Sequence, residues 1–417
     1  MKARLPQGRA FVLSGVKLYV AFLFLGVVFL LAAGFAKFMA IWINWVCSLR
    51  IARKLVIADK GLNLLLIGAY PLVLLYGLGW HGPQFLRGGG GATSIEPLWW
   101  LPIGLGIFGF VALVHAAIRF RIYRPPACEL DATRELLDLR MLESWRERFV
   151  GSGGLMRRIA LLPGNEQFTI EVSTKSYRLP RLPVTWNGLT IVHLSDLHFY
   201  HSVAKDYFKQ VCEQAAKLQP DIYIFSGDLL DDVRRLDWLP ETLGQLHAPL
   251  GQYFVLGNHD WYLDPVATRS ELARLGWTDL APHFALIGSP TDSSAAPLVL
   301  CGDETPWMGA HADLTKAPQD TFRILVSHTP DNIEWARRHR IDLMLSGHTH
   351  GGQVRLPLLG PIYSPSRYGC RYASGVFWRD PTLLYVSRGI SGKEPLRYNC
   401  PPEVTKLVLR STPSSGR

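Results

Sequence analysis

The chain has 417 residues, of which 48% are hydrophobic, and it carries a formal net charge of +10. This length predicts two or three domains, and the hydrophobic share excludes a disordered or collagen-like chain. Six cysteines are too few for a disulfide-stapled scaffold, and none of their spacings is that of a zinc ribbon.

The positive charge lies in the first third of the chain. Residues 1–126 hold 13 Lys and Arg and two acidic residues, whereas the remainder has a net charge of −1. The basic residues flank apolar runs, which is typical of membrane spans rather than of a nucleic-acid-binding face. We therefore expect a membrane as a partner and no nucleic acid.

Three uncharged runs, residues 18–36, 61–86 and 97–118, are each long enough to cross a bilayer as a helix. Buried helices of a soluble protein are the alternative, but apolar residues continue around each helix with no polar face. Residues 88–91 predict a flexible loop before the third span. We expect no signal-peptide cleavage, because the first apolar stretch continues beyond Lys37.

The flanking charges predict an orientation. With three spans, five basic residues lie on one side of the membrane and eight on the side of the C-terminal domain. The larger number predicts that this domain lies in the cytoplasm. An additional crossing that uses residues 38–49 would invert the orientation.

Residues 127–165 are predicted to form an amphipathic linker. Apolar side chains recur there at helical spacing, namely Leu139, Leu142, Trp145 and Phe149. This pattern predicts a charged amphipathic helix over residues 129–150. Such a helix could pack on the soluble domain or lie on the bilayer surface, and the sequence favours neither.

Short apolar strands alternate with helices over residues 166–410, which predicts an α/β domain. The expected strands are residues 189–194, 222–225, 253–256, 298–301, 324–327 and 343–345. The expected helices are residues 203–218, 265–275 and 331–340. The chain thus divides into a transmembrane region (1–126), the linker, this domain and a disordered tail (411–417).

Polar clusters directly follow five of the expected strands. They are Asp196-Leu197-His198, Gly227-Asp228, Gly257-Asn258-His259-Asp260, His328, and Gly347-His348-Thr349-His350-Gly351-Gly352. Ligands of α/β sheets bind outside the carboxyl ends of strands, so we expect these clusters to converge. Each cluster alone could be a loop, a turn or a helix cap, and only the set of five carries the prediction.

Carboxylate, imidazole and amide ligands suit Mn, Fe or Zn. Seven such ligands are too many for one tetrahedral ion, so they predict two divalent ions that share a carboxylate. The i, i+2 spacing of Asp196 and His198, and of His348 and His350, places each pair on one side of an extended segment. The neighbouring glycines allow tight turns.

With these clusters, residues 166–410 resemble the calcineurin-like metallophosphoesterase superfamily. The sequence is most similar to a bacterial membrane-associated branch that includes UDP-diacylglucosamine hydrolases. That similarity extends to residues 351–357, 365–369, 385–389, 395–397 and 401–403. The resemblance implies a four-layer α/β/β/α sandwich, a phosphoester substrate and a place in the bacterial inner membrane.

The resemblance also implies a role for each ligand. Asp196, His198 and His350 would bind the first metal ion, and Asn258, His328 and His348 the second, with Asp228 as the bridge between the ions. A hydroxide between the ions would attack phosphorus in line. His259 would stabilise or protonate the departing oxygen, with Asp260 as a candidate orienting partner.

Four further residues have candidate roles near the site. Arg388 and Arg397 are candidates for gripping a phosphate, with surface ion pairing as the alternative. Asp231 and Asp232 are either partners of the metal ligands or solvated acids at a helix start. Residues 389–394 depart from the Gly-Thr-Ser-like turn of the branch, which leaves the substrate contacts open.

The leading hypothesis is a membrane-anchored, two-metal phosphohydrolase that cleaves a phosphoester or pyrophosphate bond of a lipid-linked substrate. The first alternative is a phosphodiesterase or phosphatase acting on soluble nucleotides or phosphoproteins. A non-catalytic membrane sensor ranks lower, because every expected ligand position is filled. A transporter is disfavoured because the spans hold few polar residues. The sequence leaves the oligomeric state open.

Overall fold

The computed structural model describes residues 7–80, 97–289, 292 and 294–413. The chain divides into two compact units. The first comprises Met1–Val46 and Arg53–Ile122, and the second comprises Cys47–Ala52 and Tyr123–Arg417. The loop predicted at residues 88–91 lies outside the described residues.

Three long helices make up the first unit. They are α1 (Gln7–Cys47), α2 (Arg53–Leu74, continued by a π-helical turn over Leu75–Trp80) and α3 (Pro97–Ile122). All three are long and apolar enough to be candidate membrane spans. Because α1 runs unbroken to Cys47, residues 38–47 extend the first span instead of forming an additional crossing.

Two β-sheets form the centre of the second unit. The first sheet has the strand order β1-β2-β15-β3-β4-β5-β6. Its strands are β1 (Glu129–Asp138), β2 (Thr169–Arg178), β15 (Glu403–Arg410), β3 (Thr190–Leu194), β4 (Ile222–Phe225), β5 (Gln252–Phe254) and β6 (Thr278–Asp279). Strands β3 to β6 are parallel, so their carboxyl ends share one edge.

The second sheet has the order β13-β14-β10-β9-β8-β7. Its strands are β13 (Gly375–Arg379), β14 (Thr382–Val386), β10 (Leu343–Ser346), β9 (Arg323–Ser327), β8 (Leu298–Asp303) and β7 (Phe284–Ile287). Strands β8, β9, β10 and β14 are parallel. A separate small hairpin joins β11 (Arg355–Leu356) to β12 (Gly360–Pro361).

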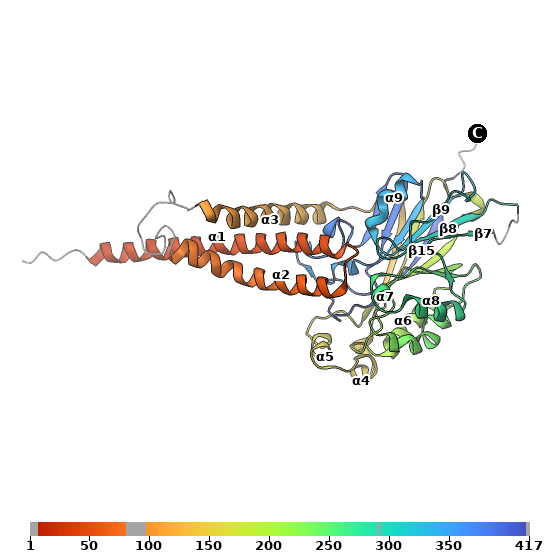
Figure 1. The fold of residues 1–417 in the computed structure, drawn as a ribbon, viewed down its shortest axis with the longest axis horizontal. Coiled ribbons are helices and arrows are strands. Elements are labelled where there is room, and N and C mark those ends of the chain that lie inside the picture. Colours follow the sequence, from red (N-terminus) through yellow and green to blue (C-terminus); the bar gives the residue numbers. More distant parts are fainter. Residues whose placement is uncertain (1–6, 81–96, 290–291, 293, 414–417) are drawn as a thin grey trace, which may run out of the picture. The chain divides into compact units, whose positions relative to one another are not determined.

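Helices cover the outer face of each sheet. Helices α6 (Lys205–Lys217) and α8 (Pro265–Arg274) lie on one side of the strands and α9 (Ile333–Arg338) on the other (Figure 1). One apolar cluster fills the space between the two sheets. Each of two further clusters lies between one sheet and the helices that cover it. These layers confirm the predicted α/β/β/α sandwich, and the six expected strands and three expected helices are present.

The helix predicted over residues 129–150 is wrong. Residues 129–138 form the edge strand β1, antiparallel to β2, followed by a 3-10 turn (Leu139–Met141) and the short helix α4 (Trp145–Phe149). Nine residues of β1 are in register with β2, and the backbone hydrogen bonds of this pairing outweigh the local helical preference. The charged side chains suit an exposed edge strand, because charge there blocks pairing with other chains.

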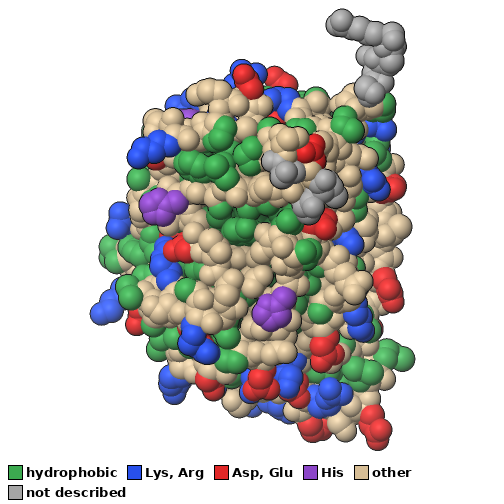
Figure 2. Space-filling view, turned by 90° about the vertical axis from the view of Figure 1, so that its right-hand side faces the viewer, with side chains coloured by type: hydrophobic (Ala, Val, Ile, Leu, Met, Phe, Trp, Pro, Cys, Tyr) green, Lys and Arg blue, Asp and Glu red, His purple; other side chains and the backbone are tan. Residues whose placement is uncertain are grey.

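The charges of the second unit are mixed. Figure 2 shows Lys and Arg side chains interspersed with Asp and Glu side chains over one face of the molecule. This mixture agrees with the nearly neutral composition of the C-terminal two thirds of the chain. The positive excess therefore belongs to the basic residues that flank the candidate spans.

A buried histidine between the sheets makes the fold sensitive to acid. The Nε2 atom of His193 on β3 lies 2.8 Å from Ser226 Oγ, and its ring packs edge-on against Tyr385 of the other sheet. Burial lowers the pKa of His193 to about 4. The unfolded chain therefore binds a proton there more readily than the folded chain between about pH 6.5 and pH 4.

We predict that His193→Gln flattens the acid dependence of stability. The stability that neutral His193 maintains is complete above pH 6.5 and is lost toward pH 4, on the order of 1 kcal/mol per pH unit. The midpoint temperature of thermal unfolding, measured for the full chain in detergent, should therefore decrease less steeply in this variant as the pH is lowered. Exposed His247→Gln serves as the control, and equal slopes for all three proteins would contradict the prediction.

Candidate metal centre

The seven predicted ligands come together at the carboxyl ends of the strands. Asp196 and His198 follow β3, Asp228 follows β4, and the other ligands follow β5, β9 and β10. Asp196, His198, Asp228 and His350 form one group, whose potential ligand atoms all lie within 4.8 Å of one another. Asp228, His328 and His348 form a second such group.

One carboxylate oxygen belongs to both groups. Asp228 Oδ2 lies 3.5 Å from His198 Nε2 and 3.2 Å from His328 Nε2. In the first group, His350 Nε2 lies 3.2 Å from His198 Nε2 and 3.6 Å from Asp196 Oδ1.

Asn258 completes the second group. Its Oδ1 lies 3.3 Å from His328 Nε2, and His348 Nδ1 lies 3.1 Å from the same nitrogen. Every distance in both groups therefore joins atoms that can serve as metal ligands.

The hydrogen bonds of the histidines test whether these atoms fit a cation. The Nδ1 atoms donate to oxygens that only accept: His198 to Asp231 Oδ2 (3.0 Å), His328 to the Ser226 carbonyl (2.7 Å) and His350 to the Ser391 carbonyl (3.0 Å). In a neutral imidazole, Nε2 then carries a lone pair. Lone pairs that face one another at about 3.2 Å repel unless a cation or proton lies between them. The donor set fits a divalent metal ion.

Without a cation, protons balance the buried carboxylates. Burial acts to lower the pKa of His198, but Asp231, Asp228 and Asp196 outweigh it and raise the pKa to about 9. Burial is likewise outweighed at His328, where Asp228 and Asp196 raise the pKa to about 9. A metal ion supplies the same positive charge, so its binding displaces these protons.

The ligands lie on strained turns. Five of the seven have a positive φ, namely Asp196 (56°), His198 (47°), Asp228 (57°), His348 (68°) and His350 (50°). The left-handed region costs a non-glycine residue about 1 kcal/mol or more. The members of each i, i+2 pair therefore do not lie on an extended segment, as the spacing suggested, because both are left-handed residues on a turn.

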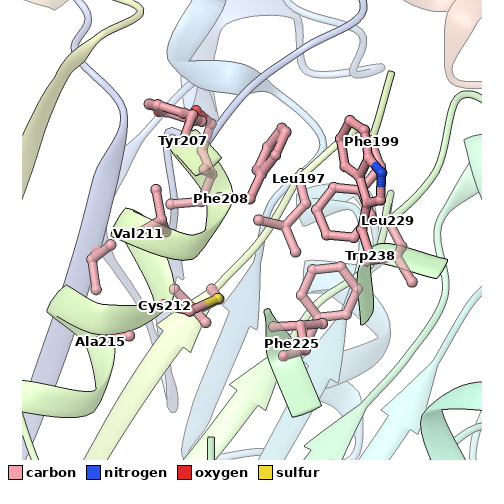
Figure 3. Close-up of a cluster of buried hydrophobic side chains, with 14 of the residues drawn as sticks. Leu197, Phe199, Tyr207, Phe208, Val211, Cys212, Ala215, Phe225, Leu229 and Trp238 are labelled. Carbon is pink, nitrogen blue, oxygen red and sulfur yellow. The ribbon is translucent and has the colours of Figure 1, made fainter. Parts of the chain in front are cut away.

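Apolar neighbours hold these turns in place. Leu197 and Phe199 alternate with the ligands of the first cluster, and Leu229 follows Asp228. Figure 3 shows these side chains among Phe208 and Trp238 in the core, and all three are fully buried. Burial of a large apolar side chain contributes about 1.5–3 kcal/mol, which is enough to offset the local strain.

Two glycines let the ligand loops approach closely. A Cβ atom on Gly347 would lie 1.8 Å from Ser195 Oγ, and one on Gly257 would lie 2.2 Å from Asp228 Oδ1. No other residue fits at these contacts without moving the backbone of the site. The sequence predicted tight turns at these glycines, and at Gly257 and Gly347 the structure shows a close approach of two loops instead.

Asp231, and not Asp260, contacts the imidazole of His259. One oxygen of Asp231 lies 2.6 Å from His259 Nδ1, and the other accepts from His198. The buried Asp260 carboxylate instead accepts backbone N–H groups of Gly257, Asp228, Leu229 and Leu230. Asp260 thus fixes the loop that carries Asp228, while Asp231 joins the two histidines.

Asp232 behaves as an acid at a helix start. It accepts the backbone N–H of Arg234 and forms an ion pair with the Arg234 side chain. This contact lowers the pKa of Asp232. The sequence left two roles open for these adjacent acids. In the structure, Asp231 contacts the candidate ligand His198, whereas Asp232 lies at a helix start.

Neither Arg388 nor Arg397 offers its guanidinium group to a substrate. The largely buried Arg388 is neutralised by ion pairs with Glu171 (2.7 Å) and Glu403 (2.8 Å). Arg397 is fully buried and donates to the carbonyls of Arg388, Ser391 and His350. The expected phosphate grip, and the alternative of surface ion pairing, therefore both fail, because the two groups brace the turn behind His350.

One aromatic neighbour of the site escaped the sequence analysis. The Trp307 ring, on the loop after β8, lies 5.6 Å from the ring of His328 and 4.9 Å from that of His348. Trp307 is buried and closes the side of the second group. Its position depends on the packing of a long loop, so no local pattern could indicate it.

Comparisons with known proteins agree with this geometry. A model of the calcineurin-like phosphoesterase family matches residues 189–352. The uncharacterised metallophosphoesterase YkuE of Bacillus subtilis is 30% identical over 255 residues, which cover 59% of this chain and 88% of the relative.

Two further relatives have named activities. Phosphodiesterase YaeI of Escherichia coli is 30% identical over 52% of this chain and 81% of its own length. The UDP-2,3-diacylglucosamine pyrophosphatase LpxG of Chlamydia trachomatis is 29% identical over 56% of this chain and 88% of its own length.

We predict that Asp228→Asn purifies with much less bound metal than the unchanged protein. The substitution removes the negative charge that both ligand groups share while keeping the shape of the side chain. Elemental analysis of protein purified without chelator measures the metal content. Asp264→Asn, at an exposed helix cap that Asn can replace, is the control. A full metal content in Asp228→Asn would contradict the shared role.

Proposed function

This chain belongs to the calcineurin-like metallophosphoesterases, and we propose that it is a membrane-anchored hydrolase of a lipid-linked phosphoester or pyrophosphate. Members of the family hydrolyse phosphoesters with divalent metal ions, so the chain is a metal-dependent phosphoester hydrolase. The observation that carries the proposal is the pair of ligand groups that share Asp228, in a chain with three candidate spans.

The proposal assigns the ligands to two ions. Asp196, His198 and His350 hold the first, Asn258, His328 and His348 hold the second, and Asp228 bridges them. The short distances within each group support this division. When bound, two ions such as Mn, Fe or Zn neutralise the phosphoester, lower the pKa of the attacking water and orient the reacting oxygens.

His259 is assigned to the leaving group. It is the most exposed imidazole of the cluster, with 24% of its side chain accessible. Because Asp231 accepts from Nδ1, Nε2 is the nitrogen that can reach a departing oxygen. Asp231 holds the ring in one tautomer and one orientation, as a carboxylate does for a catalytic histidine.

The membrane part of the proposal rests on the helices and on one relative. Three apolar helices precede the phosphoesterase domain, and LpxG is named for a lipid substrate. We propose a multi-pass protein of the bacterial inner membrane, with the domain of residues 166–410 in the cytoplasm, where the greater number of flanking basic residues lies.

A soluble substrate is the second candidate. The similarity to YaeI, named as a phosphodiesterase, favours an enzyme that cleaves diesters without regard to a lipid. A non-catalytic sensor ranks third, because candidate ligands occupy all seven positions and fall into two close groups.

The substrate class can be tested directly. With Mn²⁺, the purified full chain should hydrolyse UDP-2,3-diacylglucosamine in mixed micelles with a higher kcat/KM than bis(p-nitrophenyl) phosphate, and Asp228→Ala should abolish both activities. Release of UMP from the lipid substrate and release of p-nitrophenol from the diester are the measurements. Efficient hydrolysis of the soluble diester without any of the lipid would support the second candidate instead.

Asp231→Asn should lower kcat by about 10²–10³ with a smaller effect on KM, because the His259 ring loses its orienting carboxylate. The acid limb of the pH–rate profile should shift as well, which a purely structural role would not cause. Asp232→Asn is the adjacent control. Metal content is measured in parallel, and a normal kcat in metal-loaded Asp231→Asn would contradict the role.

A further inference from the structure

Most of the candidate site is buried. Six of the seven candidate ligands are buried, and the seventh, His350, has a partly exposed side chain, of which 13% is accessible. His259, beside the first group, is the other accessible residue. The accessible edge of the site therefore lies at His259 and His350, and the residues next to His259 form part of its rim.

Helix α7 (Asn258–Tyr262) connects His259 to that rim. Trp261 and Tyr262 follow His259 directly, and the Tyr262 ring lies 6.3 Å from the His259 ring. Both aromatic residues contact the segment Cys47–Ala52, which belongs to the same compact unit. Tyr262 OH donates to the Ile51 carbonyl (3.1 Å), and the Arg50 guanidinium lies 5.5 Å from the centre of the Trp261 ring.

The segment Cys47–Ala52 is covalently bound to two candidate spans. Its first residue, Cys47, is the last residue of α1, and its last residue, Ala52, directly precedes Arg53, where α2 begins. Ile51 is two residues from Arg53, so even an extended chain places it within about 7 Å of the start of α2. The segment itself therefore lies next to the end of a candidate span, at the level where that span would leave a bilayer.

The chemistry of this rim suits an anionic headgroup at that level. Arg50 is exposed, and a guanidinium stacked on an aromatic ring can still donate its N–H groups to a phosphate. Tryptophan and tyrosine favour the membrane–water interface. Arg50 thus offers the phosphate contact that the buried Arg388 and Arg397 cannot supply.

We propose that the segment Cys47–Ala52 and the end of α7 form a substrate-selecting rim, at which Arg50 binds the anionic headgroup of an amphiphile whose acyl chains stay in the bilayer. This inference rests on the proposed function and deepens it. It assigns substrate choice to a loop between two spans, far in sequence from the metal ligands. Soluble phosphoesters would reach the metals without this selection.

The test uses the full chain in phosphatidylcholine nanodiscs, with hydrolysis of bis(p-nitrophenyl) phosphate as the readout. Two inhibitors are compared, hexadecyl phosphate in the bilayer and methyl phosphate in water. The unchanged protein should be inhibited by hexadecyl phosphate according to its mole fraction in the disc. Arg50→Gln should raise the inhibitory mole fraction roughly tenfold, the loss expected for one charge-assisted hydrogen bond.

The inhibition constant of methyl phosphate should change much less in Arg50→Gln. Arg274→Gln, which removes an exposed arginine at the end of α8, is the matched control and should behave like the unchanged protein. The rim is refuted if hexadecyl phosphate does not inhibit, or if Arg50→Gln weakens both inhibitors equally or neither. Absence of any metal-dependent hydrolysis would instead refute the proposed function and the rim together.

Discussion

A single carboxylate oxygen, Asp228 Oδ2, lies between the ring nitrogens of His198 and His328, one from each group of candidate ligands. Negative charge and lone pairs at these distances repel one another, and only protons or metal ions can hold them together. Much of the surrounding structure resists this repulsion. The strained ligand turns are held by buried leucine and phenylalanine side chains, and the four backbone N–H groups bound to Asp260 fix the turn that carries Asp228.

Asp231 connects the first group of candidate ligands to His259. Because it accepts from His198 and His259 together, the orientation of the ligand and that of the proposed proton donor cannot vary independently. On the opposite side, Arg397 and the Ser391 carbonyl hold His350 from behind. Hydrogen bonds thus orient the imidazoles on both sides of the site, and the accessible His259 lies next to the proposed rim.

The sequence was sufficient for the ligands and for the strands that precede them, because polar residues directly after short buried runs report on local structure. The sequence was insufficient wherever the position or role of a residue depends on a partner far away along the chain. Strand β15 lies between β2 and β3 only through long-range pairing, and β1 carries a charged pattern that its edge position explains afterwards. Likewise, the choice between Asp231 and Asp260 depends on which way each loop turns, and Arg388 is buried only because Glu171 and Glu403 are brought to it.

Electron paramagnetic resonance of the manganese-loaded protein tests directly whether two metal ions share Asp228. Ions about 3.5–4 Å apart that share a carboxylate are magnetically coupled, so we predict a coupled dimanganese spectrum. A spectrum of isolated Mn²⁺ ions at full metal loading would contradict the shared centre, and with it the assignment of the seven ligands.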